Sequence, residues 1–133
     1  MDDLERSPGY ADLLRDYVQT FEELEVVLAL ARTGRGALSV DELVIGTTLP
    51  EPTVQAALAA LTRRGLVRDM PPGHAIDDRD PQLTTQVAAL LAGYQTNRVG
   101  IMAAMATNAL MRVRTSAVRA FARAFLLGHK DDR

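Results

Sequence analysis

The stretch that decides the fold runs from Ser39 to Val67 and reads SVDELVIGTTLPEPTVQAALAALTRRGLV. It opens on a capping box, in which the hydroxyl of Ser39 and the carboxylate of Glu42 each accept a hydrogen bond from a free amide at a helix start. A short helix is expected to follow and to end near Gly46-Thr47-Thr48. A second helix, over 51–64, is predicted from a proline in its first turn, helically spaced apolar residues and a glycine directly after it.

A third helix precedes this stretch and a hairpin follows it. Thr20-Phe21-Glu22-Glu23 is another capping box, and apolar residues then recur at helical spacing up to Gly34-Arg35-Gly36. Leu66-Val67-Arg68 and His74-Ala75-Ile76 are predicted to be strands, joined by the turn Pro71-Pro72-Gly73. The predicted fold is therefore mainly α: a helix-turn-helix with a small β wing.

The residues from Ser39 to Val67 resemble the winged-helix domains of bacterial transcription regulators of the broad MarR/ArsR/TrmB type. With the preceding helix and the wing, the resemblance extends over about residues 20–76. The sequence departs from the pattern in the turn, where Thr47-Thr48 stands in place of the usual Leu-Gly pair. The residues that carry the resemblance are Glu42-Leu43, Leu49-Pro50-Glu51-Pro52-Thr53-Val54, Leu58, Leu61 and Gly65-Leu66-Val67.

The resemblance implies a DNA-binding transcriptional regulator, whose helix Glu51–Arg64 enters the major groove of double-stranded DNA while the wing lies on the backbone. Gln55 is suited to pair with adenine, and the nearby arginines to reach phosphates. Arg63 and Arg64 can equally be solvated charges that stabilise a helix C-terminus. The candidate DNA-binding residues are Pro52, Thr53, Gln55, Arg63, Arg64, Arg68 and His74.

The charge of the chain is distributed unevenly. The net charge is −2, but residues 1–80 contain eight arginines and 15 acidic residues, a balance of −7. Residues 81–133 contain seven basic and two acidic residues, a balance of +5. The half that resembles a DNA reader is thus the acidic half, which suits phosphate contacts poorly. The alternative function is a protein–protein interaction module that has lost DNA binding.

The C-terminal region predicts a homodimer. Arg98 is the only charged residue from Pro81 to Met111, and a continuous helix of about 31 residues there would span roughly 46 Å. Such a helix is too long for one small domain to cover, although a monomer whose helix folds back remains the alternative. The candidate dimerisation residues form one stripe: Leu83, Val87, Leu90, Leu91, Tyr94, Ile101, Met102 and Met105.

A separate last helix is expected to begin at Thr115 or Ser116 and to end at Leu127, before a charged tail over 128–133. Its apolar face contains Val118, Phe121 and Phe125. The arginines around it have three interpretations: a solvated face, charges that offset the acidic half, or a binding surface for DNA or an acidic partner. Those arginines are Arg112, Arg114, Arg119 and Arg123.

The remaining patterns exclude several protein classes. Without cysteine the chain has no disulfides or thiolate ligands. Because its two histidines lie far apart in the sequence, we expect neither a metal site nor an enzyme. We expect no cofactor, no membrane segment and a cytoplasmic location. Asp77-Asp78-Arg79-Asp80 is more consistent with a helix cap before Pro81 than with a cation loop. The predicted organisation is a tail with a short helix (1–19), a winged-helix domain (20–79) and a helical dimerisation region (80–133).

Overall fold

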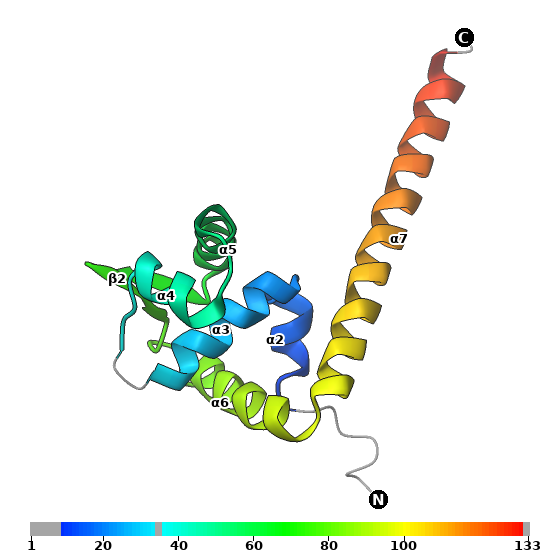
Figure 1. Cartoon of the computed structure of the whole chain (residues 1–133). Coiled ribbons are helices and arrows are strands. Elements are labelled where there is room, and N and C mark those ends of the chain that lie inside the picture. The colour runs from blue at the N-terminus through cyan, green and yellow to red at the C-terminus, as the bar shows by residue number, and fades with distance from the viewer. Residues whose placement is uncertain (1–8, 34–35, 132–133) are drawn as a thin grey trace, which may run out of the picture.

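The fold is mainly α, as predicted. The computed structural model describes residues 9–33 and 36–131, with side chains described through Leu126. Helices make up 74% of it, and the only sheet among these residues is a small antiparallel pair of strands (Figure 1). The elements in chain order are α2 (Ala11–Asp16), α3 (Phe21–Thr33), α4 (Val40–Thr47), α5 (Glu51–Arg64), β1 (Val67–Met70), β2 (Gly73–Ile76), α6 (Pro81–Thr96) and α7 (Arg98–Asp131).

Both predicted capping boxes are present. At the start of α4, Ser39 Oγ accepts a hydrogen bond from the Glu42 amide at 3.1 Å, and Glu42 Oε1 accepts one from the Ser39 amide at 2.9 Å. At the start of α3, Thr20 Oγ1 accepts from the Glu23 amide at 3.0 Å and Glu23 Oε1 from the Thr20 amide at 3.3 Å. The amides freed at each helix start are thus satisfied locally, which fixes where both helices begin.

The turn between α4 and α5 is held by two threonines. Thr48 adopts φ 59°, a left-handed conformation that usually requires glycine. Thr47 compensates: its hydroxyl donates to the Leu43 carbonyl at 2.7 Å and accepts from the Leu49 amide at 3.2 Å. The departure from Leu-Gly therefore still yields a tight turn between the two helices.

The strands β1 and β2 pair in an antiparallel register from Val67 opposite Ile76 to Met70 opposite Gly73. Leu38, just before α4, adds a short bridge to β2, since its amide and carbonyl each bond to His74 at 2.8 Å. A side chain at Gly73 would place Cβ only 2.5 Å from the Leu38 carbonyl oxygen. Glycine at this position is what lets the hairpin attach to the start of α4.

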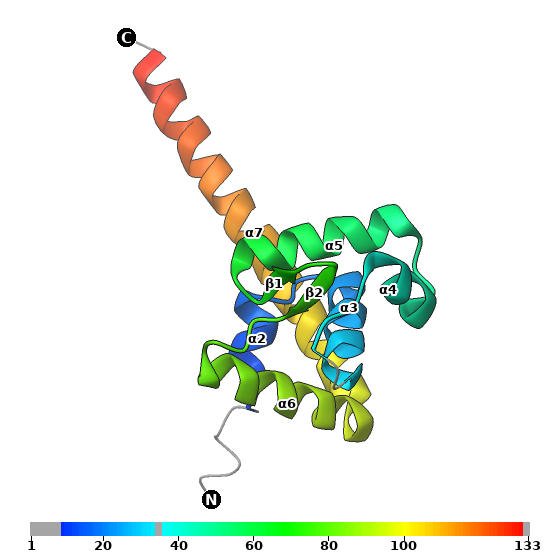
Figure 2. The ribbon, with the colours of Figure 1, turned by 90° about the vertical axis from the view of Figure 1, so that its left-hand side faces the viewer.

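The predicted long helix over 81–111 is wrong in one respect: it breaks at Asn97. The Asn97 amide closes the end of α6 with a 2.7 Å bond to the Gly93 carbonyl. Its side-chain Oδ1 then accepts from the Gly100 amide at 3.2 Å and caps the start of α7. The chain reverses there, so α6 and the first turns of α7 pack on α2 and α3 of the same molecule (Figure 2).

The candidate dimerisation stripe consequently lies in the core of a single chain. Because the turn at Asn97 folds the region back, most of these side chains are covered by other helices of the same chain. One core joins parts of all three predicted segments. Of the stripe, Leu83, Val87, Leu90, Tyr94, Ile101 and Met105 are buried, while Leu91 and Met102 are partly buried against them.

The predicted separate last helix is also wrong, because α7 continues without a break from Arg98 to Asp131. No glycine or proline interrupts the sequence between Ile101 and Leu127, so nothing stops the helix at Thr115. Its first turns are anchored by Ile101 and Met105, which are 0% and 3% exposed. Its outer half projects from the rest of the molecule as a single rod (Figures 1 and 2).

Candidate nucleic-acid interface

Three of the candidate DNA-binding residues line one groove between α5 and the β hairpin. Gln55, Arg63 and His74 surround a space of about 510 Å³, together with Asp69. Arg63 is exposed and forms no hydrogen bond or ion pair with the described residues. The amide of Gln55 instead donates to Glu51 Oε2 at 3.0 Å, one helical turn earlier. A base contact by Gln55 would have to replace this exposed bond.

The hairpin contributes a charge that depends on protonation. Nδ1 of His74 lies 3.0 Å from Oδ1 of Asp69, its cross-strand neighbour. The distance suits an ion pair if the imidazole is protonated, but Nδ1 has no hydrogen-bond partner among the described residues. His74 is 23% exposed and Asp69 71% exposed. The carboxylate is therefore the more prominent charge on this side of the groove.

Arg64 does not belong to the exposed surface, which corrects its assignment as a DNA-binding candidate. Its Nη1 donates to Glu23 Oε1 at 2.6 Å and to the Tyr17 carbonyl at 2.8 Å. The two side chains of the ion pair are only 20% and 7% exposed. Gln19 also donates its amide to Glu23 Oε1, at 2.7 Å. Arg64 therefore joins the end of α5 to the start of α3, and leaving this pair for a phosphate would strand a buried carboxylate.

The other candidates lie apart from the groove. Arg68 on β1 faces Asp78, with Nη1 and Oδ1 3.7 Å apart. Pro52 and Thr53 line a different hollow, between the first turns of α3 and α5, together with Glu22 and the buried Glu23. The structure thus separates the seven candidates into three residues in the groove, one arginine in an inward ion pair, and three residues at two other places.

The charge along the outer face of α5 changes sign from one end to the other. Glu51 begins the helix and is exposed, and Glu22 lies beside its first turns. Exposed Arg63 lies at the opposite end, where a positive side chain also suits the negative pole of the helix dipole. Between them the exposed positions carry no charge, and two of them are the small residues Ala56 and Ala59. The face can approach another surface closely, but its charge favours an anion only toward its C-terminal end.

The exposed apolar surface of the C-terminal region lies outside the predicted dimerisation stripe, in the outer half of α7. Large apolar side chains lie open to solvent along the outer half of α7, where Phe121 is 73% exposed and Phe125 stacks on it with ring centroids 6.5 Å apart. The apolar face predicted around Val118 was the signal for this surface. Its exposed members are Leu110, Met111, Val113, Val118, Phe121, Phe125 and Leu126.

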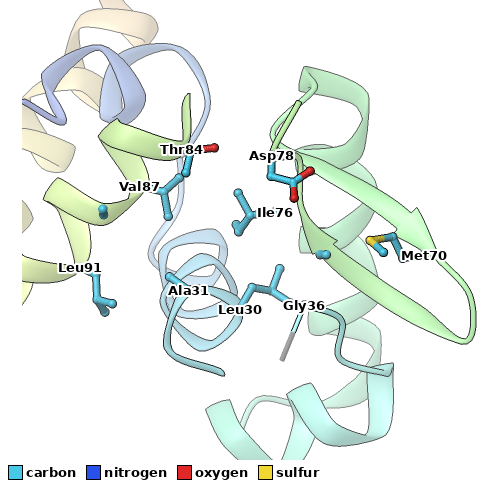
Figure 3. A pocket seen from close by; sticks show the side chains of 11 residues that line it. Leu30, Ala31, Gly36, Met70, Ile76, Asp78, Thr84, Val87 and Leu91 are labelled. Carbon is cyan, nitrogen blue, oxygen red and sulfur yellow. The ribbon is translucent and has the colours of Figure 1, made fainter. Parts of the chain in front are cut away.

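A second, largely apolar cavity lies on the opposite side of the hairpin, among α3, β2 and α6. It measures about 420 Å³ and is lined mainly by aliphatic side chains. Figure 3 shows the carboxylate of Asp78 and the hydroxyl of Thr84 at one side of it, above Ile76. Its apolar wall is formed by Leu30, Met70, Ile76, Val87 and Leu91.

The acidic loop before α6 acts as a cap. Asp80 accepts a hydrogen bond from the Gln82 amide at 2.9 Å, and Pro81 follows as the first helical residue, as predicted. Asp77 is held by the Arg79 guanidinium at 2.6 Å and by the Arg79 amide at 3.1 Å. The guanidinium and then the amide lower the pKa of Asp77 from 3.8 to about 2. The described residues contain no cluster of three or more acidic, histidine or cysteine side chains able to hold a metal ion.

Comparisons of the chain with protein-family models, with curated proteins and with solved structures find no match. Within residues 9–33 and 36–131, none of the helices combines the length and the apolar character needed to cross a membrane. The function proposed below therefore rests on the fold, the grooves and the surface charges described above.

Proposed function

We propose that this chain is a winged-helix DNA-binding protein that acts as a dimeric transcriptional regulator. The observation that carries the proposal is the placement of α5. It follows α4 across the tight Thr47-Thr48 turn, packs its inner residues Val54, Leu58 and Leu61 on the core, and leaves its outer face open beside the β hairpin. A helix presented in this way fits the width of a major groove, and the hairpin beside it suits a backbone contact.

The end of α5 at Arg63 supports the phosphate contact that DNA binding needs. Arg63 is exposed and unpaired among the described residues, and it lies in the same groove as His74 of the hairpin. Ala56 and Ala59 leave room for the edges of bases, and their methyl groups suit the methyl group of thymine. The DNA partner is thus recognised by a small, partly apolar face with its positive charge at one end.

The dimer is supported by a different surface from the one the sequence suggested. Monomeric proteins rarely expose a long apolar stripe, and the outer half of α7 exposes one at helical spacing. The side chains at its centre follow a three–four spacing, which is the repeat that packs two helices side by side. Leu110, Val113, Ala117, Phe121 and Ala124 form this central line.

Selection from a random-sequence duplex pool, followed by fluorescence anisotropy on the enriched sites, tests the proposal. We expect binding that weakens steeply with salt, and a Kd that rises in Arg63→Ala for every sequence alike. Gln55→Ala is expected to relax the preference at a single base position by about 10-fold, within the 1–3 kcal/mol of one base contact. A matched control is Arg32→Ala, which removes one exposed positive charge from α3. No retention of any duplex at low salt would overturn the DNA-binding function.

The alternative function is an interaction module for a protein partner. The observation in its favour is the acidic first half of the α5 surface, where Glu51 engages Gln55 and Glu22 lies alongside. This alternative predicts that Glu22→Gln and Glu51→Gln strengthen duplex binding little and abolish capture of a basic peptide partner. The same anisotropy assay with a duplex and with an arginine-rich peptide separates the two functions.

A further inference from the structure

Several arginines of α7 have no acidic partner among the described residues, unlike most of the described arginines in the preceding elements. In the described part of the chain, Arg15, Arg64, Arg68 and Arg79 each contact a carboxylate within 4 Å. Arg112, Arg119 and Arg123 contact none, and no Asp or Glu occurs in the sequence from Pro81 to Lys130. Within the described residues, no carboxylate neutralises these three arginines of α7.

Three of these arginines lie on the same face of α7 as the residues that pack into the hydrophobic core. Ile101 and Met105 mark that face where the helix is buried, and Arg112, Arg119 and Arg123 continue it at intervals of four or seven residues. Contacts agree with this geometry. Arg112 Nη2 donates to the Gln19 carbonyl at 3.1 Å, and Arg119 lines a groove of about 450 Å³ with Arg112 and with Arg15 of α2.

The same row begins beside the C-terminal end of α5. Arg64 at that end bonds to the Tyr17 carbonyl, and Arg112 at the base of the free rod bonds to the Gln19 carbonyl two residues along. The segment between α2 and α3 therefore joins the two positions. Both views show α7 rising past the level of α5 on the same side of the molecule (Figures 1 and 2). A duplex seated on α5 would be flanked by this face of α7.

We propose that Arg112, Arg119 and Arg123 bind the phosphate backbone of the duplex beside the base pairs that α5 reads. This inference rests on the proposed DNA-binding function and deepens it by assigning the main non-specific contact. The occupant follows from charge: the row carries three guanidinium groups without an acidic partner among the described residues, and phosphates are the anions that lie in a regular row along DNA. The hydroxyls of Thr115 and Ser116, in the same groove, add hydrogen-bond donors for phosphate oxygens.

The assignment also accounts for the acidic first half of the chain. A DNA reader needs positive charge near phosphates, and the face of α5 supplies only Arg63. The row on α7 supplies the rest from an element that does not read sequence. Base reading and backbone attraction are then divided between two helices, and the carboxylates around α5 keep non-specific binding by that helix weak.

The test is the salt dependence of duplex binding by the double variant Arg119→Ala/Arg123→Ala. Both side chains are exposed, so we expect the fold and thermal unfolding to be unchanged. Each phosphate contact contributes about 0.9 to the slope of log Kd against log salt, so the slope should fall by about 2 for each bound protomer, for specific and random duplexes alike. The matched control, Arg32→Ala/Arg114→Ala, removes the same charge from other surfaces and should keep the full slope.

Duplex length and assembly provide further readouts. Trimming the duplex to the base pairs around α5 should weaken the wild type and leave the double variant nearly unaffected. An unchanged slope in the double variant would overturn this inference while leaving DNA binding by α5 intact. A loss of dimer mass in sedimentation would instead assign the arginines to the acidic surface of a second copy and also overturn it. Absence of duplex binding by the wild type would overturn both proposals.

Discussion

Arg63 and Arg64 are adjacent in the sequence but have opposite roles in the structure. Arg64 neutralises the buried Glu23, whereas Arg63 is open to solvent. We expect Arg64→Ala to lower the free energy of unfolding by about 2–4 kcal/mol, because it leaves a buried carboxylate without its partner. Arg63→Ala should change it by less than about 0.5 kcal/mol. Urea denaturation of the two variants checks this, and equal losses would contradict the assignment.

Thr48 is under local strain that glycine would relieve. A β-branched residue at φ 59° costs on the order of 1–2 kcal/mol. Replacing Thr48 by glycine removes this strain, but unfolded glycine has a larger conformational entropy, which offsets part of the stabilisation. Thr48→Gly should therefore stabilise the fold by about 0.5–1 kcal/mol. Gly65 at φ 91° is the reverse case: a Cβ added there would meet nothing within 4 Å, so Gly65→Ala should cost about 1 kcal/mol through its backbone alone. A destabilised Thr48→Gly would mean that the threonine hydroxyl outweighs the strain.

Asp77 gives the stability a specific dependence on acid. The folded state lowers the pKa of Asp77 from 3.8 to about 2, so this carboxylate stabilises the fold above pH 4. That contribution is lost as the pH falls through the folded pKa near 2. Between pH 4 and 2 the wild type should therefore lose more stability than Asp77→Asn, measured by chemical denaturation at each pH. Parallel curves for the two proteins would rule out this role.

The start of α7 after the break is capped by a single side chain. Asn97 caps α7 through its 3.2 Å bond to the Gly100 amide, so Asn97→Ala should destabilise the fold by about 1 kcal/mol. Gln95→Ala, an exposed change close by that removes no cap, is the control. Thermal unfolding of both variants measures the difference, and similar midpoints would show that packing alone fixes the turn.

Local signals predicted local structure well. The capping boxes at Thr20 and Ser39 and the glycine after Arg64 placed three helix ends, because each depends on neighbours in the sequence. The break at Asn97 was missed, since asparagine before Arg98 is a weak cap signal inside a long apolar pattern. That pattern cannot show whether its apolar face is covered by the same chain or by another one. The sequence also could not show that the Arg64 side chain points inward, because its partner Glu23 lies 41 residues away along the chain.

At the scale of the whole molecule, the hydrophobic core contains only the first turns of α7. The last buried side chain of α7 in the described residues is Met105, and every described position from Val113 to Leu126 is exposed. A chain that ends at Thr115 should therefore keep its fold and lose its dimer. Circular dichroism and sedimentation measure the two properties separately. Unfolding of the shortened chain would show that the rod stabilises the domain.

The dimer has its own test at this scale. Val113→Glu and Phe121→Glu place a charge in the exposed apolar line of α7, and we expect each to yield monomers in sedimentation equilibrium. Thr115→Glu adds the same charge to the opposite face and should leave the mass unchanged. Dimers that survive both substitutions in the apolar line would move the interface elsewhere on the molecule.

The turn at Asn97 also makes the molecule a lever. A rigid helix of 34 residues is about 50 Å long, so a rotation of about 10° at its base moves its far end by roughly 9 Å. In a dimer held by the rods, the same rotation would instead swing the two domains, and with them the two copies of α5. The angle between α6 and α7 at Asn97 would thus set the distance between the two copies of α5. That distance decides which spacing of DNA half-sites the dimer can span.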